Sequence, residues 1–221
     1  EEIDALKKAL IKLTNSLVMH SKESVQEDLK SLKEKESGRE RIKKNSAYDN
    51  SVEAMLGNAK FLLDDCRKKG TVEFSRLARL AFIGKIILKS LVRKSIIDAG
   101  FYDNFMNSIS TVAKEMSKDF RLLGSGQMKH DDFVKKYYHL RPGSYDITSP
   151  RYESNPGLLK ALSFDLHDEQ SSSFNLDDGM DIKITKALKQ EGLKFDAMQL
   201  LEFIKSALEA RELSKFQFTK N

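Results

Sequence analysis

The placement of proline constrains the fold of this 221-residue chain more than any other feature. All 3 prolines lie between residues 142 and 156, and the chain has only 11 glycines. Proline removes a backbone donor and clashes with the preceding helical turn, so helix interiors avoid it. A content of 40% hydrophobic and 32% charged residues suits a soluble, helix-rich protein. We therefore expect an all-α fold, a bundle of about seven helices with one long irregular loop around 139–177.

Apolar residues recur at three- and four-residue spacing over most of the remaining chain, as on one face of an amphipathic helix. Residues 23–44 are rich in Lys, Glu and Arg, so they predict either an exposed helix or a partly ordered connector. Elsewhere the spacing predicts helices over about 2–20, 48–69, 72–98, 102–122, 131–138, 178–190 and 197–215. Asp196 and Gln199 have the spacing of a capping box for the last of these.

Gly70 and Thr71 predict a boundary between two helices, because glycine often follows a helix end and threonine is a common N-cap. The helix after this boundary, over about 72–98, is the most apolar in the chain. Its apolar residues cover most of its circumference, which is typical of a central helix packed on several sides. A narrow basic stripe that could face solvent or a ligand is formed by Lys85, Lys89 and Arg93.

The domain organisation expected from these patterns is one helical domain over 1–221. It comprises a helical bundle over 1–138, the irregular loop over 139–177 and closing helices over 178–221. The chain starts without Met in an amphipathic segment and stops without a helix stop signal. These features predict a fragment of a larger multidomain enzyme.

Composition excludes several function classes. No apolar stretch, including the one at 86–88, approaches the roughly 20 residues of a membrane span, so no membrane partner is expected. The single cysteine, Cys66, excludes an internal disulfide and fits a reducing cytosol, so we expect a cytoplasmic protein. A net charge of +5 is a small excess on a heavily charged surface. A nucleic-acid partner would rest only on that charge and on the basic run 39–44, and an ordinary solvated surface is favoured.

The segment from residue 139 to 152 concentrates groups that could bind a ligand. Pro and Gly at 142 and 143 have the chemistry of a type II turn. Guanidinium groups can bind phosphate or carboxylate through two hydrogen bonds at once. The candidate substrate-binding residues of this segment are His139, Arg141, Gly143, Tyr145, Asp146 and Arg151. The alternative is a structural clasp, in which Asp146 pairs with an arginine and the tyrosines fill the core.

The segment Tyr137-Tyr-His-Leu-Arg-Pro-Gly-Ser-Tyr-Asp-Ile-Thr-Ser-Pro-Arg-Tyr152 resembles bacterial proteins related to phosphoenolpyruvate synthase and pyruvate phosphate dikinase. Two positions depart from that pattern: Tyr138 stands where glycine is usual, and Ser144 replaces threonine. Similar resemblance is found over 63–71, 105–113 and 209–221.

The resemblance implies that the chain is the central helical segment between an ATP-grasp domain and a phosphohistidine domain. In related antibiotic phosphotransferases this region carries the acceptor, and His139, Arg141, Gly143, Asp146, Pro150 and Arg151 align with a comparable loop. The parent would be a phosphotransferase that uses ATP and Mg²⁺. The fragment itself would not be catalytic, would hold no cofactor, and would have the neighbouring domains and a small-molecule acceptor as partners. A purely architectural helical spacer is the alternative.

The chain contains no Gly-rich phosphate loop, no phosphohistidine motif and no histidine pair at metal-ligand spacing, so no metal site is predicted. Cys66 is interpreted as a small buried residue. Asp165, Asp177 and Asp178 are interpreted as caps or surface carboxylates. Arg79, on the most apolar helix, either extends to solvent or pairs with a buried carboxylate.

Overall fold

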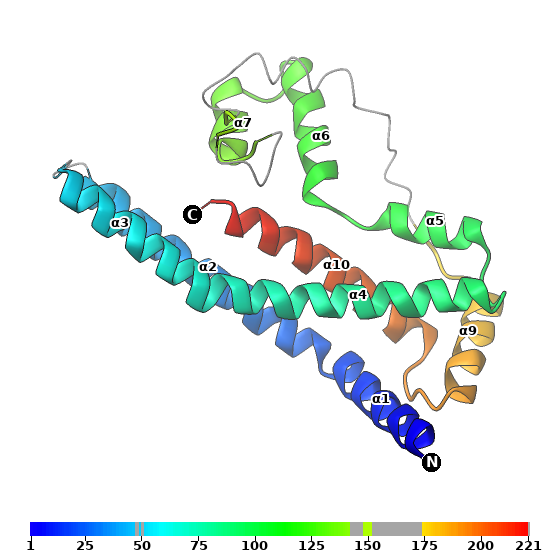
Figure 1. The fold of residues 1–221 in the computed structure, drawn as a ribbon. Coiled ribbons are helices and arrows are strands. Elements are labelled where there is room, and N and C mark those ends of the chain that lie inside the picture. The colour runs from blue at the N-terminus through cyan, green and yellow to red at the C-terminus, as the bar shows by residue number, and fades with distance from the viewer. Residues whose placement is uncertain (47–48, 50, 142–147, 152–173, 221) are drawn as a thin grey trace.

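The structure, a computed structural model, describes residues 1–46, 49, 51–141, 148–151 and 174–220 (Figure 1). These residues form helices and no strand, which confirms the all-α expectation. The elements are α1 (Glu2–Met19), α2 (Ser21–Ser46), α3 (Val52–Asp65), the π-helix η1 (Cys66–Gly70), α4 (Thr71–Arg93), α5 (Ala99–Ser108), α6 (Val112–Gly124), α7 (His130–Tyr137), α9 (Asp178–Gln190) and α10 (Ala197–Phe218). In the described part of the chain, no helix has the length and apolar content needed to cross a membrane.

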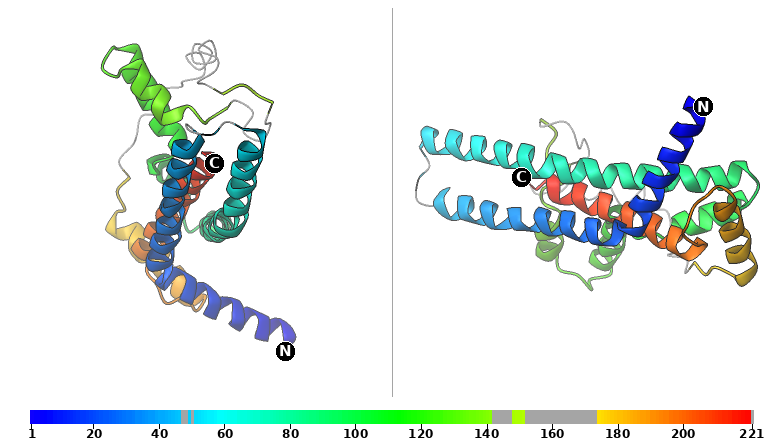
Figure 2. Two further views of the ribbon diagram at one scale, coloured as in Figure 1. Left: turned by 90° about the vertical axis from the view of Figure 1, so that its left-hand side faces the viewer. Right: turned by 90° about the horizontal axis from the view of Figure 1, so that it is seen from below.

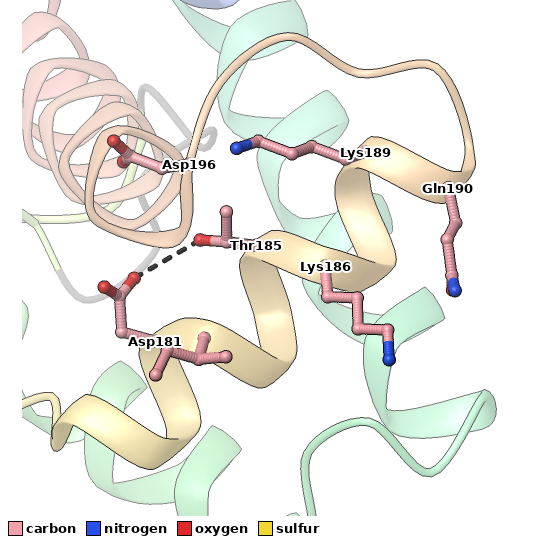
Figure 3. Close-up of a pocket in the computed structure, with 7 residues that line it drawn as sticks. Asp181, Thr185, Lys186, Lys189, Gln190 and Asp196 are labelled. Atoms are coloured by element: carbon pink, nitrogen blue, oxygen red, sulfur yellow. Dashed lines mark hydrogen bonds between the residues drawn. The ribbon is translucent and has the colours of Figure 1, made fainter.

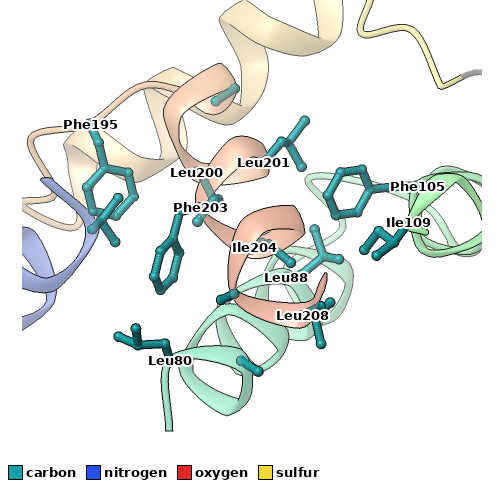
Figure 4. Packing of buried hydrophobic residues seen from close by; sticks show 14 of the residues in the cluster. Leu80, Leu88, Phe105, Ile109, Phe195, Leu200, Leu201, Phe203, Ile204 and Leu208 are labelled. Carbon is teal, nitrogen blue, oxygen red and sulfur yellow. The ribbon is translucent and has the colours of Figure 1, made fainter. Parts of the chain in front are cut away.

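The last helix, α10, is the centre of the main core. It lies between α2 and α4 (Figures 1 and 2), and residues along its length, including Leu200, Ile204 and Ala207, are fully buried. Figure 4 shows Leu88 of α4 beside Ile204 of α10, and Leu80 and Leu200 belong to the same cluster. The core therefore joins residues from both sides of the irregular segment, and residues 178–220 complete the bundle from inside.

The expectation that α4 would be packed on several sides is met only in part, because α4 contacts α10, α2 and α5 but leaves part of its apolar surface exposed. One side of α4 is buried, but Phe82 and Ile86 on its other side are 55% and 62% exposed. The apolar stripe of α3 is exposed as well, including Leu56 and Leu63. Periodicity reports which face of a helix is apolar, whereas the number of neighbours depends on the tertiary arrangement.

The predicted boundary at Gly70 was also wrong. Gly70 is buried and helical, with φ −71° and ψ −48°, and α3 continues through η1 into α4. Thr71 does not cap a helix; its hydroxyl donates to the carbonyl of Cys66 at 3.2 Å. A single π-turn absorbs an extra residue without ending the helix, which explains how the chain passes the glycine.

For three other segments the structure decides between expected forms or changes the expected bounds. Residues 23–44 belong to the long helix α2, which buries Val25 and Leu32, so the helix alternative is the right one. The helix expected over 102–122 is divided into α5 and α6, because Thr111 caps α6 by accepting from the amide of Lys114. The helix expected to reach residue 98 ends at Arg93, just before Ser95 adopts a positive φ of 53°.

The first helix and the last two helices confirm their sequence signals. α1 and α9 have bounds within a residue or two of those expected. Asp196 accepts from the amide of Gln199 at 2.8 Å, and the Gln199 side chain accepts from the amide of Asp196 at 3.0 Å. The capping box is therefore complete and fixes the start of the central helix.

A second, smaller core forms where α6 and α7 pack together. It is built on Phe133 and Tyr137, both fully buried, and it includes Phe120 of α6 and Phe216 near the end of α10. Through Phe216 this smaller core touches the far end of the central helix. Since α7 ends at Tyr137, the irregular segment starts from this junction.

Candidate functional site

His139 lies at the junction of α7 and the end of α10. Its ring is 4.6 Å from that of Phe216 and 5.3 Å from that of Tyr138, and both pairs are nearly perpendicular. The residue is only 5% exposed. Tyr138 therefore supplies one wall of the histidine's surroundings.

The residues just before His139 are held by a polar network. The hydroxyl of Tyr137 donates to Asp119 at 2.8 Å, and the ammonium of Lys136 donates to Asp119 at 2.6 Å and to Glu115 at 2.9 Å. Burial acts to lower the pKa of Lys136, but these hydrogen bonds outweigh it and raise that pKa. Burial and the bond to Asp119 raise the pKa of Tyr137. The base of the irregular segment is thus fixed to α6.

Cationic side chains from distant parts of the sequence surround His139. The ring's pKa is lowered to about 4, first by burial and then by Lys220, with Arg39 and Arg151 adding to the effect. The carbonyl of Phe216 acts in the opposite direction, although neither ring nitrogen has a hydrogen bond of acceptable geometry to a described residue. At neutral pH the ring is therefore uncharged, with one donor and one acceptor to offer.

Two of the cations near His139, Arg39 of α2 and Lys220 just beyond α10, are held by neighbouring groups. A guanidinium nitrogen of Arg39 donates to the carbonyl of Gln217 at 3.3 Å. The carboxylate of Glu36 lies 3.7 Å from Arg39 and 3.6 Å from Lys220. Lys220 also lies 5.1 Å from the centre of the Phe216 ring. This arrangement places two cationic groups around one carboxylate, and guanidinium and ammonium groups of this kind also bind phosphate or carboxylate.

The predicted loop residues are brought together only in part. His139 is buried, Arg141 is half-buried, and Arg151 is exposed but close enough to affect the pKa of His139. Gly143, Tyr145 and Asp146 lie outside the described residues, as does the predicted type II turn.

The structure separates the basic stripe of α4 from this junction. Lys85 is half-buried, while Lys89 and Arg93 are exposed. α4 and α10 run antiparallel, since Phe74 meets Phe218 and Gly84 meets Ile204. The stripe thus begins at the level of Ile204, about 18 Å along α10 from Phe216 at 1.5 Å per residue. The two groups of candidates do not form one site.

Sequence reasoning missed Arg39 and Lys220. The run 39–44 was interpreted as solvated surface, yet Arg39 is only 9% exposed. A signal was present in the spacing, because Arg39 is one heptad after Leu32 and two after Val25, both of which are buried. Lys220 has no comparable signal, since its position follows from where α10 ends.

Other polar groups have structural roles. Asp177 caps α9 by accepting from the amide of Met180 at 2.9 Å, as expected. Arg79 is exposed and donates to the carbonyl of Ser75. The partner of a buried carboxylate is instead the exposed Arg76, whose guanidinium lies 3.0 Å from Asp28. Cys66 is half-buried.

A shallow hollow beside α9 also proves structural (Figure 3). Its Thr185 hydroxyl donates to Asp181 at 3.3 Å and accepts from the amide of Ala197 at 2.9 Å. Asp196, on the same rim, caps α10. These polar atoms are already engaged in joining α9 to α10. Across the described residues, no group of three or more His, Cys, Asp or Glu side chains could hold a metal ion.

Comparisons of the chain with protein-family models, curated proteins and solved structures gave no match. The junction of His139, Arg39 and Lys220 is therefore assessed from its geometry and chemistry.

The state of His139 predicts a pH dependence of stability. Its folded pKa of about 4 is below the ordinary value of 6.5. Between these values the unfolded chain binds more protons, so stability is complete above pH 6.5 and decreases as the pH falls toward 4. At pH 4.5 the loss attributable to this group is about 2–3 kcal/mol. Urea unfolding at pH 7.5 and 4.5 measures it.

The variant His139→Phe keeps the aromatic packing and removes the titration, so its stability should change less between the two pH values than that of the unmodified chain. His130→Gln, at an exposed histidine, is the matched control and should retain the original difference. Equal changes in the unmodified chain and His139→Phe would contradict the assignment.

Proposed function

We propose that this chain is the central helical domain of a cytoplasmic, phosphoenolpyruvate-synthase-like, ATP-dependent phosphotransferase, where it contributes to binding the acceptor substrate. The observation that carries the proposal is the cationic junction at the start of the irregular segment. Arg39, Arg151 and Lys220 there act on one buried histidine, His139. The resemblance of residues 137–152 to that class of enzyme supports an acceptor-binding site at the same junction.

In this proposal the domain binds and orients but does not catalyse. The uncharged ring of His139 would donate one hydrogen bond to a phosphate or carboxylate oxygen, and Lys220 and Arg151 would supply charge. ATP and Mg²⁺ would be held by a preceding ATP-grasp domain. A histidine on a following domain would carry the phosphoryl group. The helices described here would keep the junction rigid between those domains.

The second candidate is an architectural spacer, and a specific observation favours it. His139 is enclosed by Tyr138 and Phe216, as a packing residue would be. The basic stripe of α4, which could have extended a binding surface, lies away from this junction. In this alternative the junction fixes the base of the segment, and the long α2–α3 hairpin sets the distance between neighbouring domains.

Ligand titration of the 221-residue chain separates the two candidates. NMR amide spectra recorded with inorganic phosphate, pyruvate and phosphoenolpyruvate should show saturable shifts near residues 138–141 and 216–220. Arg151→Ala should weaken binding about tenfold or more, the usual effect of losing one charge-assisted hydrogen bond. Arg79→Ala, an exposed arginine of α4, is the matched control and should leave affinity unchanged. The absence of saturable shifts with all three ligands favours the spacer.

The proposal also predicts that the chain alone is inert. Incubation with Mg²⁺ and ATP should release no phosphate and leave no acid-labile phosphohistidine. Within a natural polypeptide that contains the chain, Arg141→Ala and Arg151→Ala should raise the acceptor KM in a stably folded protein. Lower stability with unchanged acceptor kinetics would favour the spacer. ATP turnover by the isolated chain, lost on changing one residue of its own loop, would overturn the assignment.

A further inference from the structure

The first helix carries an apolar seam that is exposed to solvent over most of its length. Ile3, Leu6, Leu10, Leu13 and Leu17 alternate three- and four-residue spacing, the a and d positions of a heptad repeat. The first four are 82%, 60%, 53% and 54% exposed. Scattered apolar residues are normal on a surface, but four consecutive seam positions form a contiguous stripe.

The side of α1 that contacts the protein is a different one. Asn15 and Val18 are buried there. The Asn15 amide donates to the carbonyl of Gly192 at 3.1 Å, and its oxygen accepts from the amide of Lys194 at 2.8 Å. At 100° per residue this contact lies about 130° around the helix from the seam. Figures 1 and 2 show α1 leaving the bundle at an angle, with its N-terminus projecting.

The seam borders an apolar groove. On one side of the groove are Leu6 and Leu10 of α1, and on the other are Ile87 of α4 and Leu193 of the turn between α9 and α10. Its volume of about 360 Å³ is enough for a few aliphatic side chains. A helix laid along the seam would therefore contact the main body as well as α1.

The seam and its flanking charges match a second copy of the same helix. Leu6 and Leu13 at the d positions and Ile3 at the first a position fit a two-stranded, parallel coiled coil, while the other two a positions, Leu10 and Leu17, are leucine. In this register Glu2 occupies a g position and Lys7 the following e position. A parallel pair then places Glu2 of each copy beside Lys7 of the other, giving two opposite-charge contacts, whereas an antiparallel pair does not.

We propose that α1 is an interface between two copies of this chain, joined through the seam as a short parallel coiled coil. The seam, from Ile3 to Leu17, spans only about two heptads, so association is expected in the micromolar range, as for small interfaces.

Sedimentation velocity of the chain between about 1 and 200 μM tests the pairing, across the concentrations where a micromolar interface dissociates. A concentration-dependent monomer–dimer equilibrium is expected. Leu6→Glu combined with Leu10→Glu should leave a monomer throughout with unchanged helical circular dichroism. Leu56→Glu, at the equally exposed apolar stripe of α3, is the matched control and should still dimerise. A monomer at the highest concentration, or a dimer that persists in the double seam variant, overturns the proposal.

Charge reversal tests the parallel orientation. Glu2→Lys should weaken dimerisation about five- to tenfold, since it turns two attractive contacts into repulsive ones. Lys7→Glu should do the same, although it also removes an exposed ion pair with Glu191 at 3.7 Å. The double variant Glu2→Lys, Lys7→Glu restores complementarity and should recover most of the affinity. If the double variant is no better than either single change, the parallel pairing is overturned.

Discussion

Replacing Gly84 with leucine is expected to leave the chain without a stable native fold at 25 °C. Gly84 lies on the buried face of α4, where α10 approaches most closely. A Cβ atom at this position would be 2.9 Å from Cγ1 of Ile204 and 3.4 Å from its Cα. Inserting extra methylenes into a packed core costs about 1–3 kcal/mol and occasionally more. Leucine adds four carbons against a backbone atom that cannot rotate away, so a loss above this range is expected, a large part of the total stability of about 5–15 kcal/mol for a typical domain.

Smaller changes at the same contact give a measurable series. Gly84→Ala gains up to about 1 kcal/mol of helix propensity but introduces the close contact, so a net loss of about 1 kcal/mol is expected. Ile204→Ala, at a fully buried position, should cost about 2–5 kcal/mol. In the Ile204→Ala background the obstructing Cγ1 is gone, and Gly84→Ala should then become neutral or stabilising. Urea unfolding followed by circular dichroism gives this double-mutant cycle.

Gly57 provides the matched control for Gly84. It lies inside α3, and a Cβ there meets nothing within 4 Å. Gly57→Ala should therefore stabilise the protein by up to about 1 kcal/mol through helix propensity alone. A Gly84→Leu variant as stable as the unmodified chain would refute the close approach of α4 and α10.

The glycines show how far the sequence predicts this fold. Gly70 was expected to end a helix, but neither Gly70 nor Gly84 does so, and the two glycines have different roles. Gly70 continues one through a π-turn and Gly84 permits a helix crossing. The capping box at Asp196 and Gln199 was predictable because both of its hydrogen bonds lie within four residues. A hydrogen bond between near neighbours can be predicted from a few residues of sequence. The crossing of α4 and α10 depends instead on a residue more than a hundred positions away in the chain.

The same distinction applies to the candidate site. Residue types and spacing were sufficient to single out the segment around His139 and Arg141. They could not indicate that Arg39 and Lys220 reach the same histidine, because α2 and α10 meet only in the folded chain. Nor could they separate the basic stripe of α4, whose distance from the segment is set by the antiparallel packing of α4 on α10. The sequence therefore predicted which residue types could bind a ligand, but not which of these residues lie together in the folded chain.

Replacing Asp119 with alanine is expected to unfold the α6–α7 unit in preference to the main core. Asp119 is 7% exposed and accepts hydrogen bonds from both Tyr137 and Lys136. Its removal leaves the buried hydroxyl of Tyr137 without this acceptor and the ammonium of Lys136 with only the exposed Glu115. Breaking one partner of a buried charged network costs about 3–5 kcal/mol. Hydrogen exchange followed by NMR measures where that loss appears.

Amides over 112–137 should exchange faster in Asp119→Ala by a factor of about 10² to 10³, which corresponds to this loss. Amides of α10 around Ile204 should stay protected, because the main core does not include Asp119. Tyr137→Phe removes only one hydrogen bond and should cost about 1 kcal/mol. Glu115→Ala, at a carboxylate that is 54% exposed, is the matched control and should cost less than about 1 kcal/mol. Equal loss of protection in α10 and α7 would mean that the two cores unfold together, because Phe216 then couples them more strongly than the Asp119 network holds α7 to α6.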